Sequence, residues 1–267
     1  MAILFVGIDL AKNVFAVHGV DEYGKAVLVR PAVQRAKLHE LVKSEDEQAR
    51  LCVHRVRQGF VEQRTATINR LRGLLSEFGI VLPQKAAIVR RQATAHLEDL
   101  PGWANTAVGD SLSEVHRLDE RLAEYDRHVS HMAANDERSR RLMQLQGVGC
   151  TTASALVSTI GDAHDFRNGR QLAAWLGLVP GQYSSGGKAR LGSITKAGDR
   201  YLRTLLVLGA KSVLAAAKSK DDRLSRWALA LQVRRGYWRA IVAIAAKNAR
   251  MAWAVLAKGE SFRPILI

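Results

Sequence analysis

The 267-residue chain contains only two cysteines and five prolines. Cys52 and Cys150 stand alone, with no Cys-x-x-Cys pair and no histidine at the spacing of a zinc site. The sequence therefore predicts neither a disulfide framework nor a zinc site, as is typical of proteins in a reducing cytoplasm. Residues 1–10 are apolar but lack a basic leader and include Asp9, so we do not expect a signal peptide.

An uninterrupted apolar run of membrane-spanning length is also absent. Residues 240–256 are rich in Ala, Ile and Val, but Lys247, Asn248 and Arg250 lie in the middle of the run. Charged side chains are costly in lipid. We therefore expect a buried or amphipathic helix here, and no membrane.

Acidic residues are scarce, because 25 Asp and Glu stand against 40 Lys and Arg, which gives a formal net charge of +15. Such a charge favours nucleic acid or an anionic membrane surface as a partner, because bound cations release condensed counterions. Two helical stretches gather the arginines, which favours DNA or RNA, although a solvated helix face is the simpler explanation for part of them. The first stretch contains Arg50, Arg55, Arg57, Arg64, Arg70 and Arg72, and the second contains Arg223, Arg226, Arg234, Arg235 and Arg239.

Strand-like apolar patterns occur only near the N-terminus, at residues 3–8, 14–20 and 26–29. After Pro31 the pattern becomes helical, from Gln34 through Val42, and it does not clearly return to strand afterwards. We expect an α+β fold that is mostly α. Its parts are predicted to be an N-terminal β region (1–42), a basic helical and coiled-coil region (43–140), and a helical C-terminal domain (141–267).

Two long helices are predicted in the middle of the chain. Residues 45–78 carry apolar positions at helical steps with arginines between them, which indicates an amphipathic helix with a basic face. The next helix has a heptad seam, which either packs on the preceding helix or pairs with a second copy in a homo-oligomer. The seam consists of Val115, Leu118, Leu122, Tyr125, Val129 and Met132.

Gly147-Val148-Gly149 separates two predicted helices, the second beginning at Thr151 or Thr152. A tight glycine turn before a helix is typical of a helix-hairpin-helix, which directs N-terminal amides such as that of Thr151 at a nucleic-acid phosphate. A plain turn is the alternative. A repair-type helix-hairpin-helix protein would also explain these residues, but it would leave the segment described next without a role.

Residues 183–203 combine hydroxyls, glycines and cations, the composition of a phosphate-handling loop. Within it Ser185 is a candidate nucleophile toward phosphorus. An ordinary exposed turn or a passive phosphate site is the alternative. The predicted nucleic-acid contacts of this segment are Gly186, Gly187, Lys188, Arg190, Lys196, Arg200 and Arg203.

The chain resembles the bacterial insertion-sequence transposases of the IS110 and IS1111 group. The resemblance rests on Asp9 after the first strand, on Gly147-Val148-Gly149, on residues 170–180, and on the segment that contains Ser185. It implies an RNase H-like (RuvC-like) domain with four metal-binding acids, followed by a domain with a catalytic serine. By this likeness Asp9 is the first acid and a Mg²⁺ ligand, and Ser185 forms a phosphoserine link to DNA. A guide RNA is the further partner that the resemblance implies.

The sequence departs from the family pattern at one place. Residues 38–42 pass directly into residues 43–47, where the family continues into strands that carry the other three acids. One carboxylate makes a poor Mg²⁺ site, and the nearest replacements, Glu40, Glu45, Asp46 and Glu47, lie in helical sequence. The first strand would also become an apolar edge. We expect a transposase impaired by an internal deletion, or alternatively a catalytically inactive nucleic-acid-binding protein derived from one.

Overall fold

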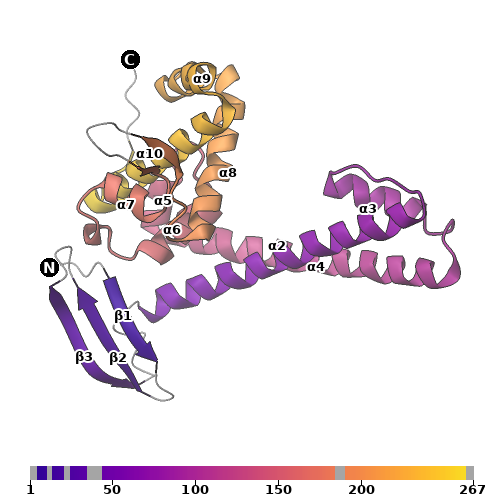
Figure 1. Ribbon diagram of the computed structural model, residues 1–267, viewed down its shortest axis with the longest axis horizontal. Coiled ribbons are helices and arrows are strands. Elements are labelled where there is room, and N and C mark those ends of the chain that lie inside the picture. The colour runs from indigo at the N-terminus through magenta and orange to yellow at the C-terminus, as the bar shows by residue number, and fades with distance from the viewer. Residues whose placement is uncertain (1–4, 11–13, 21–24, 35–43, 184–189, 263–267) are drawn as a thin grey trace. The chain divides into compact units, whose positions relative to one another are not determined.

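The computed structural model describes residues 5–10, 14–20, 25–34, 44–183 and 190–262 (Figure 1). The chain forms two compact units. The main unit comprises Met1–Leu51 with Met132–Ile267, and the helix-pair unit comprises Cys52–His131. The predicted fold class, α+β and mostly α, is confirmed.

Three antiparallel strands, β1 (Phe5–Leu10), β2 (Val14–Val20) and β3 (Ala26–Gln34), form one sheet in the order β1-β2-β3. Among the described residues β1 pairs only with β2, so the predicted edge position of the first strand is confirmed. The prediction of a helix from Gln34 is wrong at its start, because β3 continues through Pro31 to Gln34.

A bulge explains how Pro31 fits into β3. Val17 pairs with Arg30 and Phe15 pairs with Val33, so the register shifts between these two pairs. Proline lacks a backbone N–H and is tolerated at bulges and on edge strands, and β3 is the other edge of this sheet. The remainder of the predicted helix, residues 35–42, lies outside the described residues.

The helix-pair unit takes most of its residues from two long helices, α2 (Glu45–Glu77) and α4 (Gly102–Asn135), with α3 (Ala86–Ala95) between them. The sequence patterns predict the two long helices but not α3. The heptad seam is covered within the chain, because Val115, Leu118 and Val129 are buried. Tyr125 packs edge-on against Phe60 of α2, with 5.3 Å between the ring centroids. Of the two alternatives for the seam, the structure therefore favours packing on the preceding helix, while homo-oligomerisation stays a prediction.

Ion pairs join the two long helices at heptad spacing. Arg57 Nε lies 2.6 Å from Asp126 Oδ1, and Arg64 Nε lies 2.6 Å from Asp119 Oδ1. Asp119 also contacts Arg90 of α3. Part of the predicted basic face therefore stabilises the helix pair, as charged residues flanking a coiled-coil seam do.

In the main unit, α10 (Tyr237–Lys258) lies against four other α-helices, and eight of its residues are buried, including Ile241, Ile244 and Ala249 of the hydrophobic core (Figure 1). By length and composition α10 could cross a membrane. Its buried face is nonetheless part of the protein core, as expected for this segment. The other helices of the unit are α5 (Glu137–Leu142), α6 (Cys150–Ile160), α7 (Gly169–Trp175), α8 (Arg200–Ala216) and α9 (Arg223–Arg235).

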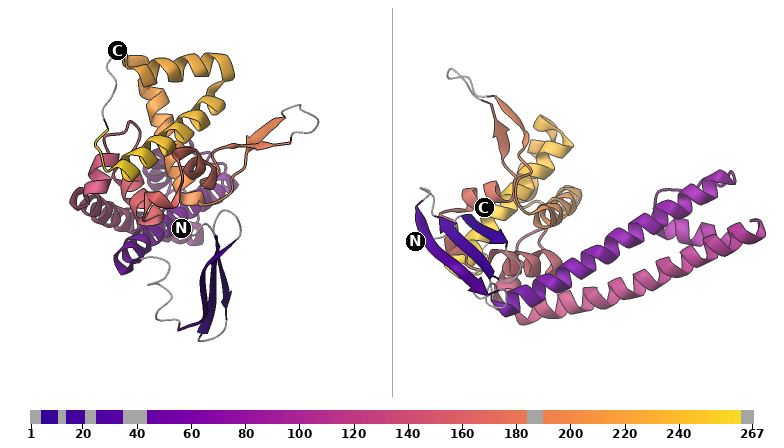
Figure 2. Two further views of the ribbon diagram at one scale, coloured as in Figure 1. Left: turned by 90° about the vertical axis from the view of Figure 1, so that its left-hand side faces the viewer. Right: turned by 60° about the horizontal axis from the view of Figure 1, so that its bottom comes forward.

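The expectation that no strand follows the N-terminal region is wrong. Pro180–Gln182 (β4) and Leu191–Ile194 (β5) pair as an antiparallel hairpin (Figure 2). Both strands are short and contain glycine, so neither has the alternating apolar pattern that would identify it.

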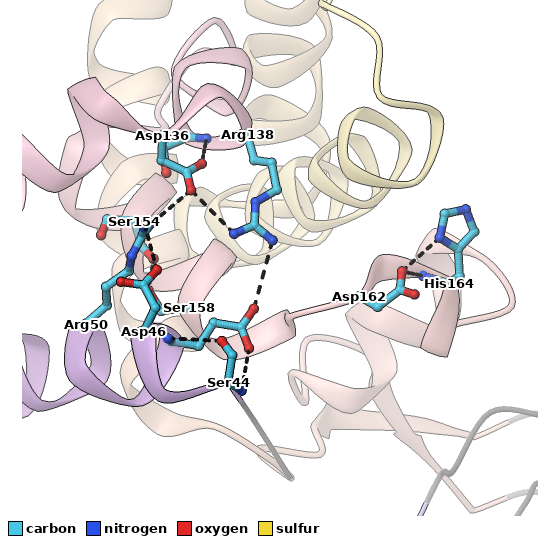
Figure 3. Close-up of polar contacts among 11 residues, drawn as sticks. Ser44, Asp46, Arg50, Asp136, Arg138, Ser154, Ser158, Asp162 and His164 are labelled. Carbon is cyan, nitrogen blue, oxygen red and sulfur yellow. Dashed lines mark hydrogen bonds and ion pairs between the residues drawn. The ribbon is translucent and has the colours of Figure 1, made fainter. Parts of the chain in front are cut away.

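Asp136 holds the start of α2 and the start of α5 together (Figure 3). Its carboxylate accepts a 2.9 Å hydrogen bond from the Ser139 N–H, which caps α5, and lies 2.8 Å from Arg50 and 3.4 Å from Arg138. Burial alone would raise the pKa of Asp136, but the Ser139 N–H and the two guanidinium groups together hold this pKa below its usual value.

The charge of Asp136 should contribute more to the free energy of unfolding than the hydrogen bond by which Asp136 caps α5. We expect Asp136→Asn, which can still cap α5, to lower the free energy of unfolding by about 2 kcal/mol, and Asp136→Ala by about 3 kcal/mol. Because the folded-state pKa is depressed, the contribution of the charge is present at neutral pH and is lost as pH falls through that pKa. Urea unfolding at pH 7 and pH 3 measures both effects.

Asp46→Asn is the control, since Asp46 also pairs with Arg50 but its side chain is 70% exposed. It should change stability by no more than about 0.5 kcal/mol. Equal stability of Asp136→Asn and the wild type at pH 7 would contradict the assignment.

Candidate catalytic and nucleic-acid site

The β4–β5 hairpin brackets the segment that contains the predicted nucleophile. The Tyr183 N–H donates to the Arg190 carbonyl over 2.9 Å, which continues the strand pairing at the outer end of the hairpin. Ser185, Gly186, Gly187 and Lys188 follow Tyr183 and lie outside the described residues. Their predicted roles therefore stay predictions.

The inner end of the hairpin is fixed by two glycines at positive φ, Gly177 (+67°) and Gly198 (+72°). A Cβ on Gly198 would lie 1.8 Å from the Trp175 carbonyl oxygen, and a Cβ on Gly177 would lie 2.3 Å from the Ala197 carbonyl oxygen. No side chain fits at either position, so two stretches of backbone make direct contact. We call residues 175–177 and 196–198 the glycine junction.

One predicted nucleic-acid residue, Lys196, belongs to this junction, and another, Arg203, contacts it. Lys196 has a positive φ of 56° and donates its N–H to the Gly177 carbonyl over 3.2 Å, while its side chain is exposed. Arg203 of α8 donates from Nη1 to the carbonyls of Leu176 (3.1 Å) and Ala197 (2.9 Å). Arg203 therefore braces the junction, and its predicted contact with nucleic acid stays a prediction.

Exposed cations surround the described part of the hairpin. Arg190 lies at its outer end and Arg200 in the first turn of α8, and both are exposed. Asp199 caps α8 by accepting the Leu202 N–H over 2.9 Å. Arg190, Lys196 and Arg200 are therefore all exposed to solvent near the ends of the two strands, where cations can meet phosphate groups.

The predicted glycine turn divides into a structural part and an exposed part. Gly147 has φ +83°, and a Cβ there would lie 2.6 Å from Val213 Cγ2 and 2.7 Å from the Gly209 carbonyl oxygen. Gly209 lies in α8 and is equally constrained, since its own Cβ would lie 1.9 Å from the Gly147 carbonyl oxygen. Close packing of the turn on α8 therefore accounts for Gly147.

Gly149 and Thr151 are better placed to meet a ligand. Gly149 is the exposed N-cap of α6, which begins at Cys150, and Thr151 is half-buried in its first turn. Both line a hollow of about 660 Å³ together with Leu208 of α8. The helix before the turn, α5, ends at Leu142, so a close helix-hairpin-helix is not confirmed.

The described acids do not form a magnesium site. Asp9 lies in β1 opposite Ala16, and the rest of the described chain has no group of three or more His, Cys, Asp or Glu that could hold a metal ion. Mg²⁺ takes six oxygen ligands, so one carboxylate from β1 does not fit it.

The acids considered above as replacements for the missing Mg²⁺ ligands do not gather around a metal site in the described part of the chain. Glu47 and Ser44 cap the start of α2 reciprocally, at 3.3 and 3.4 Å. Asp46 pairs with Arg50 over 2.8 Å. Glu45 opens α2 as an exposed residue, and Glu40 lies outside the described residues.

The sequence patterns above do not identify the glycine junction, which fixes the candidate site. The available signal was Gly198 directly before Asp199, because a glycine followed by a helix-capping acid indicates a turn into a helix. The partner of this turn, 175–177, could not be read from the sequence, because the contact joins segments about twenty residues apart.

Comparisons with known proteins place the chain among the insertion-sequence transposases. The profile of the Transposase IS116/IS110/IS902 family matches residues 139–226, which contain the glycine turn, the hairpin and α8. A probable family 20 transposase of Pseudomonas aeruginosa is 41% identical over 249 residues, covering 91% of this chain and 74% of that protein. The transposase for IS1111A of Coxiella burnetii is 36% identical over 282 residues, covering 97% and 75%.

The chain belongs to the IS116/IS110/IS902 family of transposases, which confirms the resemblance read from the sequence. The transposase for IS1328 of Yersinia enterocolitica is a further relative, 33% identical over 250 residues. DNA is accordingly a partner of this chain.

Gly147→Ala should destabilise the protein rather than weaken a nucleic-acid contact alone. Strain at positive φ and overlap with α8 together should cost about 2–5 kcal/mol of unfolding free energy. Gly149→Ala is the matched control, because its Cβ would meet nothing within 4 Å, and should cost about 1 kcal/mol or less. Urea unfolding of both variants tests this, and equal losses would contradict the division of the turn.

Arg203 and Arg200 of α8 should also differ, the first acting on stability and the second on DNA binding. Arg203→Gln should lower the free energy of unfolding by about 1.5–3 kcal/mol, because two carbonyls lose a charged donor. Arg200→Gln should leave stability within about 0.5 kcal/mol of the wild type and reduce the salt dependence of DNA binding by about one unit in slope. Unfolding curves and fluorescence anisotropy with labelled DNA measure the two effects, and a reversal of the pattern would contradict the assignment.

Proposed function

We propose that this chain is built to cleave and rejoin DNA strands through a serine nucleophile, Ser185. The observation that carries the proposal is the β4–β5 hairpin, whose inner end is locked by the glycine junction. A nucleophile needs a fixed position relative to its target, and the hairpin flanks residue 185 on both sides. Exposed Arg190, Lys196 and Arg200 provide positive charge for the DNA phosphates.

The chemical step exchanges one ester bond for another. The Ser185 hydroxyl loses its proton as its oxygen bonds to phosphorus, and the bond from phosphorus to a sugar oxygen breaks. The sugar oxygen takes up a proton and leaves as a hydroxyl. Because the serine-DNA link retains the energy of the phosphodiester, a second sugar hydroxyl can rejoin the strand without ATP.

We further propose that this copy is impaired. Mg²⁺, when bound, would supply a charge that polarises the phosphate. Of the four metal-binding acids that the family resemblance implies, however, this chain has a counterpart only for the first, Asp9. The described residues do not supply a replacement. The proposed deletion joins Val42 to Lys43, which lie outside the described residues, and β1 stands at a sheet edge as such a loss would leave it.

A guide RNA is the further partner we propose. Arg55 and Arg70 of α2 are exposed and are not members of the ion pairs of the helix-pair unit described above. They are available to the phosphates of a polyanion. Basic helices of this kind support RNA binding and DNA binding equally.

A second function is favoured by the combination of an incomplete acid set with retained basic helices. The chain would then be a catalytically inactive nucleic-acid-binding protein derived from a transposase. It would bind the ends of its element without cutting them.

Trapping of a covalent adduct separates the two functions. A labelled element-end DNA is incubated with the protein, Mg²⁺ and the element's transcript, and adducts are resolved on a denaturing gel. The wild type should form an adduct in low yield, with only a small fraction of the DNA trapped, and Ser185→Ala should form none. Ser184→Ala is the matched control and should retain the wild-type yield.

Each other outcome has a definite meaning. DNA binding without any adduct would establish the second function instead. Robust strand transfer by the wild type would contradict the proposed impairment. An adduct that persists in Ser185→Ala and disappears in Ser184→Ala would overturn the assignment of the nucleophile.

A further inference from the structure

The turn between α9 and α10 exposes aromatic side chains that a protein core would normally cover. Residues 233–239 read Val-Arg-Arg-Gly-Tyr-Trp-Arg, and each of them is exposed. Val233 is 90% exposed, Trp238 64% and Tyr237 45%. These residues lie beyond the part of the chain that the family profile matches.

The Trp238 ring is held from two sides although most of its surface is open. Lys211 Nζ of α8 lies 4.9 Å from the ring centroid, within the range of a cation–π contact. The Tyr237 ring meets it edge-on, with 5.3 Å between centroids and an interplanar angle of 75°. Gly236, at φ +84°, permits the reversal that brings both rings to the start of α10. An indole held in this way is a preformed platform for stacking.

The three helices that form this platform, α8, α9 and α10, carry mostly positive charge. Between Arg200 and Lys258, which bound α8, α9 and α10, the only acids are Asp221 and Asp222. Asp222 caps the start of α9, and Asp221 lies 3.8 Å from Arg226 near that same end. The opposite end of α9 and the start of α10 carry Arg234, Arg235 and Arg239 without an acid on the three helices to neutralise them.

The platform adjoins the hollow beside the glycine turn. Leu208 lines that hollow and is 51% exposed, and it precedes Lys211 by three residues on α8. Residues three apart on a helix share a face. One face of α8 therefore connects two features. Leu208 on this face lines the hollow together with Gly149 and Thr151, and Lys211 on the same face contacts the indole of Trp238.

We propose that this surface binds single-stranded DNA, with an unpaired base stacked on Trp238 and the adjoining phosphates on the arginines of the turn. We call it the Trp238 surface: Lys211, Arg234, Arg235, Tyr237, Trp238 and Arg239. Aromatic rings set among cations are the feature that binds single strands without sequence preference. Single strands are favoured over a duplex because a duplex hides the faces of its bases. The inference rests on the proposed function, since strand exchange releases unpaired DNA.

A tryptophan exposed elsewhere provides a matched control. Trp103 is 92% exposed in the helix-pair unit and lies outside the Trp238 surface. Fluorescence anisotropy with a labelled oligothymidylate of about twenty nucleotides, a size suited to single-strand binding sites, measures the affinity of each variant. Trp238→Ala should weaken binding roughly 5- to 150-fold. Trp238→Phe should retain most of the affinity, and Trp103→Ala should match the wild type.

Three comparisons complete the experiment. Replacing the thymidines by abasic units should abolish the difference between the wild type and Trp238→Ala, because no base remains to stack. A duplex of equal length should bind the two proteins equally. Thermal unfolding should show equal stability, since the removed ring is largely exposed.

The outcomes separate the inference from the proposed function. If the wild type binds single-stranded DNA and Trp238→Ala binds it equally, the inference is overturned and the proposed function stands. If the wild type binds no DNA, both are overturned. If Trp238→Ala weakens the duplex and the abasic strand as much as the oligothymidylate, or if it changes self-association but not DNA binding, stacking on Trp238 is refuted.

Discussion

Direct backbone contact at the glycine junction is the constraint on which the candidate site depends. Gly177 and Gly198 let the end of α7 and the start of α8 touch where no Cβ fits, and the Arg203 guanidinium joins two carbonyls across the contact. The β4–β5 hairpin begins and ends at this point, so its inner end is anchored by the backbone of the glycine junction. A second glycine pair, Gly147 and Gly209, holds the turn before α6 against α8 in the same manner. The helix α8 is thus the common support of both predicted sites.

Positive charge in this protein has two separate uses. Arg50, Arg57 and Arg64 are spaced by seven residues and pair with acids across helices, and Arg203 binds backbone carbonyls. These contacts stabilise the fold. Arg200 and the arginines of the Trp238 surface lie on exposed positions. A net charge of +15 therefore overstates the charge that nucleic acid can meet.

Apolar patterns in the sequence predicted most of the long elements. The three N-terminal strands, both long helices and α10 lie close to their predicted positions, because each carries an apolar run or repeat in its own residues. The hairpin β4–β5, the extension of β3 through Pro31 and the helix α3 were missed. Their formation depends on a partner strand, a bulge or a neighbouring helix. The structural contacts of Gly147 and Arg203 were not predicted for the same reason: a glycine or an arginine has the same local pattern whether it meets a phosphate or packs on a helix.

Amide hydrogen exchange in Gly198→Ala tests the central role of the junction most directly. The Thr195 N–H donates to Val179 and the Lys196 N–H to Gly177, so both amides report on the inner end of the hairpin. The account predicts that these two amides exchange much faster in the variant, while amides in the middle of α6 keep their protection. Unchanged exchange at Thr195 and Lys196 in a folded Gly198→Ala protein would contradict it.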